Sequence, residues 1–334
     1  MTEQPYELPG FARDLLRDSR SILLCTHENP DADGMGSLLA CGIALPKLGF
    51  EVARLGDDQL PPTLVVLAGH ESLPVDDGKR EYDLAILFDC RVPERLGPHA
   101  PALARCREVL VVDHHPPLEG EDSAGQDWVL PSAPATTLLA LALIRALGGI
   151  DTVDADAATN LYAGLVVDTG GFRHPSTTAD ALRAGAVLID RGARASEITE
   201  VLLHQRRPES IELLSKVMGA ARYEADRRIV TLEVSQDLLH ECGAFTEEAE
   251  GLISIVSAID GVRIAIMFLE GDHGNWRVSL RAHAPWRVSH IARDFGGGGH
   301  LLAAGFRSPG PLSEIRERLL AAAFAELERG DALR

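Results

Sequence analysis

The segment Asp113-His114-His115 constrains the fold of this chain more than any other part of its sequence. It follows four consecutive aliphatic residues, 109–112, and two prolines come directly after it. An uninterrupted aliphatic run predicts a strand buried on both faces, as in a parallel sheet, and the prolines end this strand abruptly. Because open α/β sheets bind ligands at the carboxyl ends of their strands, a metal site could form here. Taken alone, however, the triplet is better explained as a strand end with solvated histidines, since burying three such groups is costly.

A second segment of the same character lies near the N-terminus. Residues 21–26 predict a buried strand that leads into His27, Asp31 and Asp33, with an Asn-Pro turn between the histidine and the aspartates. Aspartate is a favourable helix N-cap, which explains Asp31 or Asp33 but not both together with His27. One imidazole and two carboxylates are ligands suited to manganese or a similar ion. By itself, this segment supports the helix cap and the metal site equally.

Two further carboxylates lie at the ends of predicted elements. Residues 83–88 predict a buried strand that ends at Asp89. A helix that begins near Asp154 has apolar residues at i, i+3, i+4 and i+7, and it leads to Asp168. The helix dipole disfavours an acid at this end unless a cation lies nearby, so Asp168 alone is better explained as an exposed side chain. One parallel sheet would bring all these ends to a single edge, and together they supply enough ligands for two metal ions and a bridging carboxylate.

The C-terminal part of the chain differs in charge from the rest. The formal net charge is −18, yet residues 276–310 contain five arginines and three histidines against one acid, Asp294. Within this stretch four glycines, 296–299, precede His300. Such a run is usually a flexible linker, but it lies inside a predicted compact domain, so a backbone nest that admits a phosphate at a helix start is favoured. A charged segment, 205–208, marks the predicted boundary between the two halves.

The composition sets broad limits on function. A chain of 334 residues is long enough for two domains. Its acidic charge argues against binding long nucleic acid through a basic surface, but it allows short phosphorylated ligands held by metals and a few arginines. The five cysteines include no C-x-x-C pair, and no secretion signal or membrane-spanning segment is evident. A cytoplasmic protein with reduced thiols is therefore expected.

In combination, these segments resemble the four motifs of the DHH phosphoesterase family, in the same order along the chain. The matching residues are His27, Asp31, Asp33, Asp89, Asp113, His114, His115 and Asp168. The segments 279–281 and 296–305 resemble the DHH-associated C-terminal domain of that family. Length and layout are most similar to the nanoRNase and pAp-phosphatase subgroup (NrnA-like proteins), where pAp is 3′-phosphoadenosine 5′-phosphate. The chain lacks room for the additional domains of RecJ-type exonucleases, and it lacks the Arg-Lys-Lys signature of the similar manganese pyrophosphatases.

The resemblance implies an α/β fold with two domains and the active site in the cleft between them. A parallel-sheet DHH domain would span 1–192, a helical linker 193–219, and a smaller α/β substrate-binding domain 220–334. It also implies two divalent metal ions, expected to be Mn²⁺. The ligands of one ion would be His27, Asp31 and Asp89. The ligands of the other would be Asp33, Asp89, His114 and Asp168, with Asp89 bridging the two.

The remaining site residues follow from the same resemblance. Asp113 would orient a histidine without touching an ion, and His115 would contact the scissile phosphate and assist the leaving group. The far phosphate and nucleotide of the substrate would be held by Arg281, Gly297, Gly298, Gly299 and His300. Leu301 and Leu302 replace a more polar pair expected in the family, which leaves the base preference open.

The sequence thus predicts a metal-dependent phosphohydrolase, an oligoribonuclease that degrades short RNA to mononucleotides and removes a phosphate from pAp. One alternative is a phosphodiesterase for cyclic dinucleotides or their linear products, pApA and pGpG. Another is a non-catalytic nucleotide sensor, although the intact ligand set argues against it. The expected partners are short single-stranded RNA, dinucleotides and pAp, and not long duplex nucleic acid or a membrane. For the oligomeric state, the sequence leaves a homodimer open.

Overall fold

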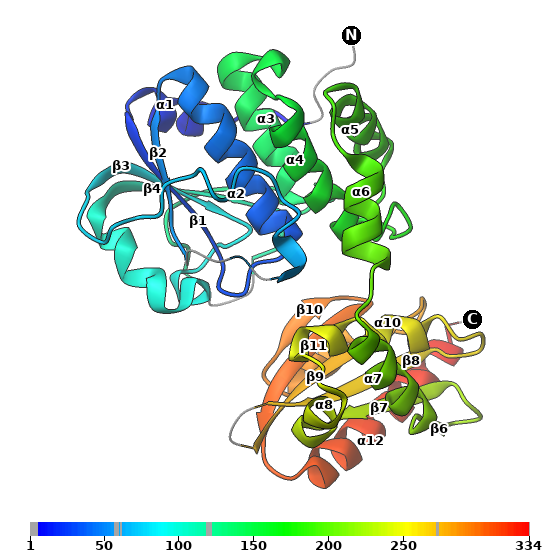
Figure 1. Cartoon of the computed structure of the whole chain (residues 1–334). Coiled ribbons are helices and arrows are strands. Elements are labelled where there is room, and N and C mark those ends of the chain that lie inside the picture. The colour runs from blue at the N-terminus through cyan, green and yellow to red at the C-terminus, as the bar shows by residue number, and fades with distance from the viewer. Residues whose placement is uncertain (1–5, 57–59, 61, 118–121, 272–273, 334) are drawn as a thin grey trace. The chain divides into compact units, whose positions relative to one another are not determined.

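The computed structural model describes residues 6–56, 60, 62–117, 122–271 and 274–333. The chain divides into two compact units, Met1–Gln205 and Arg206–Arg334, and each is described by itself (Figure 1). The finer division into two domains with a separate helical linker stays a prediction. Among the helices formed by the described residues, none is both long enough and apolar enough to cross a membrane.

The first unit is built on a five-stranded sheet in the order β2-β1-β3-β4-β5, in which every neighbouring pair is parallel. The strands are β1 (Ser21–Thr26), β2 (Glu51–Arg54), β3 (Tyr82–Phe88), β4 (Cys106–Asp113) and β5 (Gln126–Val129). The predicted parallel sheet is confirmed, and the central aliphatic residues of β1, β3 and β4 are buried. Because β1, β3 and β4 are neighbours and run in one direction, the segments that follow them meet at one edge.

In the described part of this unit there are six α-helices, and Figure 1 shows α2, α3 and α4 side by side. The helices are α1 (Gly10–Arg17), α2 (Ala32–Ala44), α3 (Thr136–Gly148), α4 (Ala155–Asp168), α5 (Ala179–Asp190) and α6 (Ala195–Thr199), with a π turn at Glu200–His204 and 3₁₀ segments at Leu45–Leu48, Pro62–Leu64, Pro93–Arg105 and Ile150–Thr152. Two glycines let α2 and α4 approach closely. A Cβ on Gly36 would lie 2.5 Å from the Asn160 carbonyl oxygen, and a Cβ on Gly164 would lie 2.7 Å from an Asp33 carboxylate oxygen.

Aspartate caps set the starts of α2 and α4. The Asp31 carboxylate accepts the backbone N–H groups of Asp33 and Gly34, at 2.9 and 3.0 Å, and Asp154 accepts that of Ala157 at 2.9 Å. The predicted start of a helix near Asp154 is therefore confirmed, and Asp154 is its N-cap. Of the two candidates for α2, Asp31 is the cap, so Asp33 lies in the first turn of the helix.

The second unit is built on a six-stranded sheet in the order β10-β11-β9-β8-β7-β6, in which only β7 and β8 are a parallel pair. Its strands are β6 (Arg222–Glu224), β7 (Ile229–Val234), β8 (Ile264–Glu270), β9 (Asn275–Ala282), β10 (Gly298–His300) and β11 (Ala303–Pro309). Its helices are α7 (Pro208–Gly219), α8 (Gln236–Cys242), α9 (Thr246–Glu250), α10 (Leu252–Ser257), α11 (Ser289–Asp294) and α12 (Leu312–Asp331). This smaller α/β unit agrees with the predicted fold class.

The two faces of this second sheet have separate cores. Along β9, Trp276, Val278 and Leu280 join a core shared with α11 and α12. Alternate residues of β7 and β8 join a second core on the opposite face, shared with α7 to α10. Arg277 and Arg281 alternate with the buried β9 residues, so they lie on this opposite face, where they are exposed and half-buried respectively.

The structure corrects the interpretation of the glycine run. Gly298–His300 is strand β10, which pairs with β11 in an antiparallel hairpin, so the next element after the glycines is a strand and not a helix. The predicted phosphate nest at a helix start is therefore wrong. The glycines allow close approach instead, because a Cβ on Gly297 would lie 2.2 Å from the Gly305 carbonyl oxygen and one on Gly299 would lie 2.6 Å from that of Ala303.

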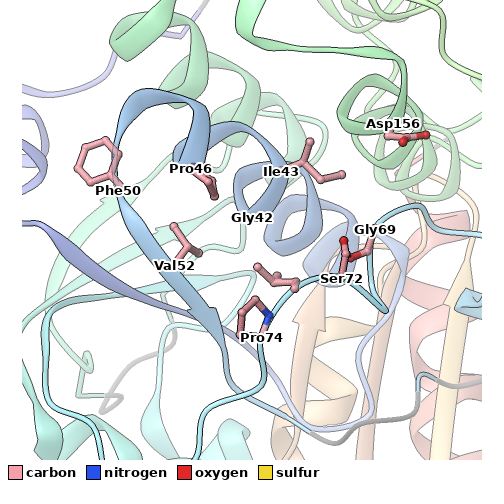
Figure 2. A pocket seen from close by; sticks show the side chains of 10 residues that line it. Gly42, Ile43, Pro46, Phe50, Val52, Gly69, Ser72, Pro74 and Asp156 are labelled. Carbon is pink, nitrogen blue, oxygen red and sulfur yellow. The ribbon is translucent and has the colours of Figure 1, made fainter.

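A pocket of about 520 Å³ lies beside α2 in the first unit. Figure 2 shows Ile43, Phe50 and Val52 among the apolar residues around it, with Asp156 at one side. Its lining includes no predicted site residue. This pocket is therefore separate from the predicted metal site.

Candidate metal centre

Residues that follow three neighbouring strands form the centre of the predicted site. His27 follows β1, Asp89 follows β3, and Asp113 ends β4 directly before His114 and His115. Asp89 has a φ angle of 56°, in the left-handed region that residues other than glycine rarely adopt. Aspartate tolerates this conformation better than most residues, and backbone strain of this kind concentrates at functional sites.

The structure brings the predicted ligands together in three overlapping groups, within each of which the ligand atoms lie within 4.8 Å of one another. The groups are His27–Asp31–Asp89, Asp33–His114–Asp168 and Asp89–His114–His115. The two carboxylate oxygens of Asp89 face different histidines: Oδ2 lies 3.5 Å from His27 Nε2, and Oδ1 lies 3.8 Å from His114 Nε2. A carboxylate between two sets of ligands is what a bridge between two ions requires.

The other three predicted carboxylate ligands lie close to the same two imidazoles, those of His27 and His114. Asp168 Oδ2 lies 3.1 Å and Asp33 Oδ2 lies 3.8 Å from His114 Nε2. On the other side of the centre, Asp31 Oδ1 lies 4.0 Å from His27 Nε2. All six predicted metal ligands are thus brought together, although they come from four separate segments of the chain.

The imidazoles of His27 and His114 fit a metal ion. Each uses Nδ1 for a hydrogen bond to a backbone carbonyl, that of Glu28 at 2.9 Å and that of Ala133 at 3.2 Å. Their Nε2 atoms are buried and have no hydrogen-bond partner among the described residues. An imidazole whose Nδ1–H donates to a carbonyl presents a lone pair at Nε2, as metal-ligating histidines do. A cation would satisfy both buried acceptors, which are otherwise costly.

The charges of the cluster also favour a cation. Burial, followed by repulsion from Asp89 and Asp168, raises the pKa of Asp31. Burial, followed by repulsion from Asp168 and Asp89, raises the pKa of Asp33 well above its usual range. A divalent cation stabilises the ionised form of nearby carboxylates, so it would offset both effects.

Helix α3 supports this centre in a way that was not foreseen from the sequence. The Asp33 carboxylate accepts the backbone N–H groups of Thr136 and Thr137, at 2.6 and 2.8 Å, from the N-terminal end of α3. The Thr136 hydroxyl donates to Asp89 Oδ1 at 3.2 Å. The N-terminus of a helix stabilises negative charge, so α3 offsets part of the rise in the pKa of Asp33 and orients its carboxylate. More than a hundred residues separate Asp33 from these threonines, and nothing local in the sequence marks their contact.

His115 lies in a different environment from His114. Asp113 Oδ1 accepts the backbone N–H of His115 at 2.9 Å and lies 3.0 Å from its Nδ1. Burial opposes protonation of His115, but hydrogen bonds to Asp113 and Asp89 raise its pKa to about 11. The side chain of His115 is 43% exposed, whereas that of His114 is 14% exposed. Asp113 thus orients His115, which is the more accessible of the two histidines.

Arg95 is a second residue that the sequence did not single out. Its guanidinium donates to the Asp89 carbonyl at 3.2 Å, and its own carbonyl accepts the Glu28 N–H at 2.6 Å. It therefore ties together the loops that follow β1 and β3. An arginine near the start of a 3₁₀ segment offers no sequence signal for this role.

The candidate residues of the second unit lie on three adjacent strands. Arg281 on β9 pairs with Ala303 on β11, which pairs in turn with His300 on β10. The half-buried Arg281 guanidinium donates to the Leu280 carbonyl at 3.0 Å, and it has no carboxylate partner within the described parts of the chain. Burial, followed by repulsion from Arg277, lowers the pKa of Arg281. A half-buried cation of this kind would be stabilised by an anionic ligand.

The chain matches two domains of one family. Residues 21–165 match the DHH family, N-terminal domain, and residues 229–329 match the DHHA1 domain. Together these matches cover most of the chain, which belongs to the DHH family of metal-dependent phosphoesterases.

Individual relatives cover nearly the whole chain. It is 29% identical over 317 residues to the bifunctional oligoribonuclease and PAP phosphatase NrnA of Thermus thermophilus, with 93% of this chain and 92% of the relative covered. It is 29% identical over 292 residues to the protein of the same name from Bacillus subtilis, with 85% and 88% covered. A solved structure of an exopolyphosphatase-related protein from Bacteroides fragilis has a TM-score of 0.82 at 21% identity, over 96% of this chain and 95% of the other, and it shows the shared fold.

Proposed function

We propose that this protein is a manganese-dependent phosphohydrolase that degrades RNA of two to five nucleotides to mononucleotides and also removes a phosphate from pAp. The observation that carries the proposal is the position of Asp89 between two imidazole–carboxylate sets whose buried Nε2 atoms lack hydrogen-bond partners among the described residues. The relatives named for both activities support the choice of substrates, since they align over most of their own length. All five cysteines are free, which suits the reducing cytoplasm.

We assign one ion to His27, Asp31 and Asp89, and the other to Asp33, Asp89, His114 and Asp168. Mixed imidazole and carboxylate ligands are suited to manganese. When bound, two such ions would lower the pKa of water and neutralise charge on the phosphoryl oxygens. The close approach of α2 and α4 and the contacts from α3 hold the ligands in place before any substrate binds.

His115 is assigned to the reacting phosphate. Its Nδ1 is held by Asp113, so Nε2 is the nitrogen that can donate a proton to the leaving oxygen. Its exposure exceeds that of His114, which agrees with contact to a substrate. Asp113 keeps the imidazole in one orientation, and it is a positioning residue in this scheme.

In the second unit, Arg281 is assigned to a phosphate of the substrate that does not react, with the Gly297–His300 hairpin beside it. Binding energy at a remote phosphate positions the reacting one, so its loss should affect natural substrates most. A bidentate arginine–phosphate contact is worth about 1.5–3 kcal/mol, or roughly ten- to a hundred-fold. Arg281→Ala and His300→Ala should therefore lower kcat/KM for short RNA by about that factor.

Two measurements test the proposal. The first is a product time course with manganese over pAp, cyclic dinucleotides and RNAs of graded length. Faster turnover of cyclic dinucleotides than of short RNA would favour the phosphodiesterase alternative, and no turnover of any substrate would favour the nucleotide sensor. The second compares Arg281→Ala with Arg222→Ala, an exposed arginine on β6, on short RNA and on a small chromogenic phosphodiester. Equal losses on both substrates would contradict the role given to Arg281.

A further inference from the structure

Arg95 lies beside the candidate metal centre and is anchored there by one hydrogen bond. Its Nη1 donates to the backbone carbonyl of Asp89, the proposed bridging ligand, at 3.2 Å. Burial and the positive charge of Arg95 both oppose the rise in the pKa of His27 that its contact with Asp89 causes. Burial raises the pKa of the Cys90 thiol, and the charge of Arg95 opposes this rise too. The guanidinium is therefore within electrostatic range of groups that follow both β1 and β3.

The remaining donors of Arg95 are available to a ligand. The residue is exposed, and it makes no ion pair with any other residue that the structure describes. Arginines elsewhere in this unit do have carboxylate partners, since Arg91 pairs with Asp127 and Arg105 pairs with Asp76. A guanidinium has five N–H donors, and the bond to the Asp89 carbonyl uses one of them.

The carboxylate of Glu28 is directed away from this guanidinium by the fold of the loop. The Glu28 N–H donates to the Arg95 carbonyl at 2.6 Å, so the two backbones are in contact. The Glu28 carboxylate lies against Gly97 instead, because a Cβ on Gly97 would lie 2.6 Å from Glu28 Oε2. Although the structure describes both residues, the side chains of Glu28 and Arg95 form no ion pair. The charge of Arg95 is thus left unneutralised next to the metal centre.

The charge of the candidate metal centre leaves a role for such a cation. Its proposed ligands include the carboxylates of Asp31, Asp33, Asp89 and Asp168. Two divalent ions would only neutralise these four carboxylates when all are ionised. A phosphodiester brings its own negative charge, and charge is spread over its non-bridging oxygens during phosphoryl transfer. Arginine suits this position because its planar fork matches phosphate oxygens.

We propose that Arg95 binds a non-bridging oxygen of the reacting phosphate, on the side of the centre formed by His27, Asp31 and Asp89. Arg95 is then a catalytic residue, and His115 serves the leaving oxygen of the same phosphate. This inference rests on the proposed function, because it assumes that a phosphate reacts at this centre. The role differs from that of Arg281, which is assigned to a phosphate that does not react.

The two arginines should therefore differ in how their loss depends on the substrate. Every substrate contains the reacting phosphate, so Arg95→Gln should lower kcat/KM about ten- to a hundredfold for short RNA and for a small chromogenic phosphodiester alike. The matched control is Arg13→Gln on α1, an exposed arginine that makes no ion pair with a described residue, and it should change neither rate. A loss confined to short RNA would overturn the inference, because Arg95 would then hold a remote phosphate.

A binding measurement tests the inference without turnover. The probe is radiolabelled inorganic phosphate, in equilibrium dialysis against the full-length protein with saturating manganese. Arg95→Gln should weaken phosphate binding about tenfold, and Arg95→Lys should weaken it less, since lysine keeps the charge but not the fork. Arg13→Gln should bind phosphate as the wild type does. Absent binding by the wild type, or equal binding by the wild type and Arg95→Gln, would overturn the inference.

A purely structural role for the bond between Arg95 and the Asp89 carbonyl gives a different result. Glutamine can still donate to that carbonyl, so manganese should raise the melting temperature of Arg95→Gln as much as that of the wild type. If the rise were smaller and excess manganese restored phosphate affinity, Arg95 would only position Asp89 and the inference would be wrong. Failure of the proposed function would show separately, as absent turnover of every substrate by the wild type.

Discussion

Replacing Asp89 by asparagine should remove most of the stabilisation that manganese gives to this protein. Asp89 belongs to two of the three groups of potential ligands, and its two oxygens face His27 and His114 separately. Asp168 belongs to one group only. Asparagine keeps the shape of the side chain and can still accept the Thr136 hydroxyl, so the change acts on the ions more than on packing.

The size of the effect follows from linkage. An ion at a hundred times its dissociation constant stabilises the folded protein by about 2.7 kcal/mol, so two ions contribute about 5 kcal/mol. For a unit of roughly 200 residues, 1 kcal/mol shifts the melting temperature by about 2–4 °C. Saturating manganese should therefore raise the melting temperature of the wild type by roughly 10–20 °C. The melting temperature of Asp168→Asn should rise by about half as much, and that of Asp89→Asn by only a few degrees.

The assay is differential scanning calorimetry in EDTA and in increasing manganese. The metal-free transition of each variant is the control for folding, and any separate transition of the unit Arg206–Arg334, which holds none of these ligands, should not move. If manganese raised the melting temperature of Asp89→Asn as much as that of the wild type, the bridging position of Asp89 would be refuted. If Asp168→Asn lost the whole shift, the assignment of two separable sites would be wrong.

Two other substitutions test the surroundings of the centre. His115→Ala should keep both ions yet slow turnover by about 10²–10⁴, the usual range for a proton-transfer group. His114→Ala should instead lose manganese. Measuring the metal content and the single-turnover rate of each variant separates these two effects. Gly164→Ala should lower the free energy of unfolding by about 1–3 kcal/mol and weaken manganese binding, because its Cβ would press on an Asp33 oxygen. Gly219→Ala, with no atom within 4 Å of its Cβ, is the control in denaturant titrations and should cause no loss.

The grouping of side chains at the candidate metal centre could be predicted because its parts are local. Each ligand follows a buried strand or lies at one end of a helix, and such elements are visible as aliphatic runs that polar residues interrupt. The parallel direction of the strands then brings His27, Asp89 and His114 to one edge without further information. The cap of α4 at Asp154 was predictable for the same reason, since a cap depends on residues within one turn.

The features that the sequence did not reveal depend on distant partners. The bonds from Thr136 and Thr137 to Asp33 form only once α3 has packed against α2. The glycine run has little intrinsic preference for a strand, and its pairing with Gly305 depends on β11. Local information could have revealed α12, whose buried residues Ile315, Leu319, Ala323 and Leu327 recur every four positions.

The contact between α2 and α4 has a consequence for ion selectivity. Asp33 lies in the first turn of α2, and Asp168 is the last residue of α4, so the two proposed ligands of one ion are attached to helices that pack in close contact. Calcium takes six to eight oxygen ligands at about 2.3–2.6 Å in flexible geometry, so it would need these ligands to spread and additional ones to enter. The bonds from α3 oppose that rearrangement at Asp33. If the assigned ions bind there, we therefore expect the support at Asp33 to favour small divalent ions over calcium by radius.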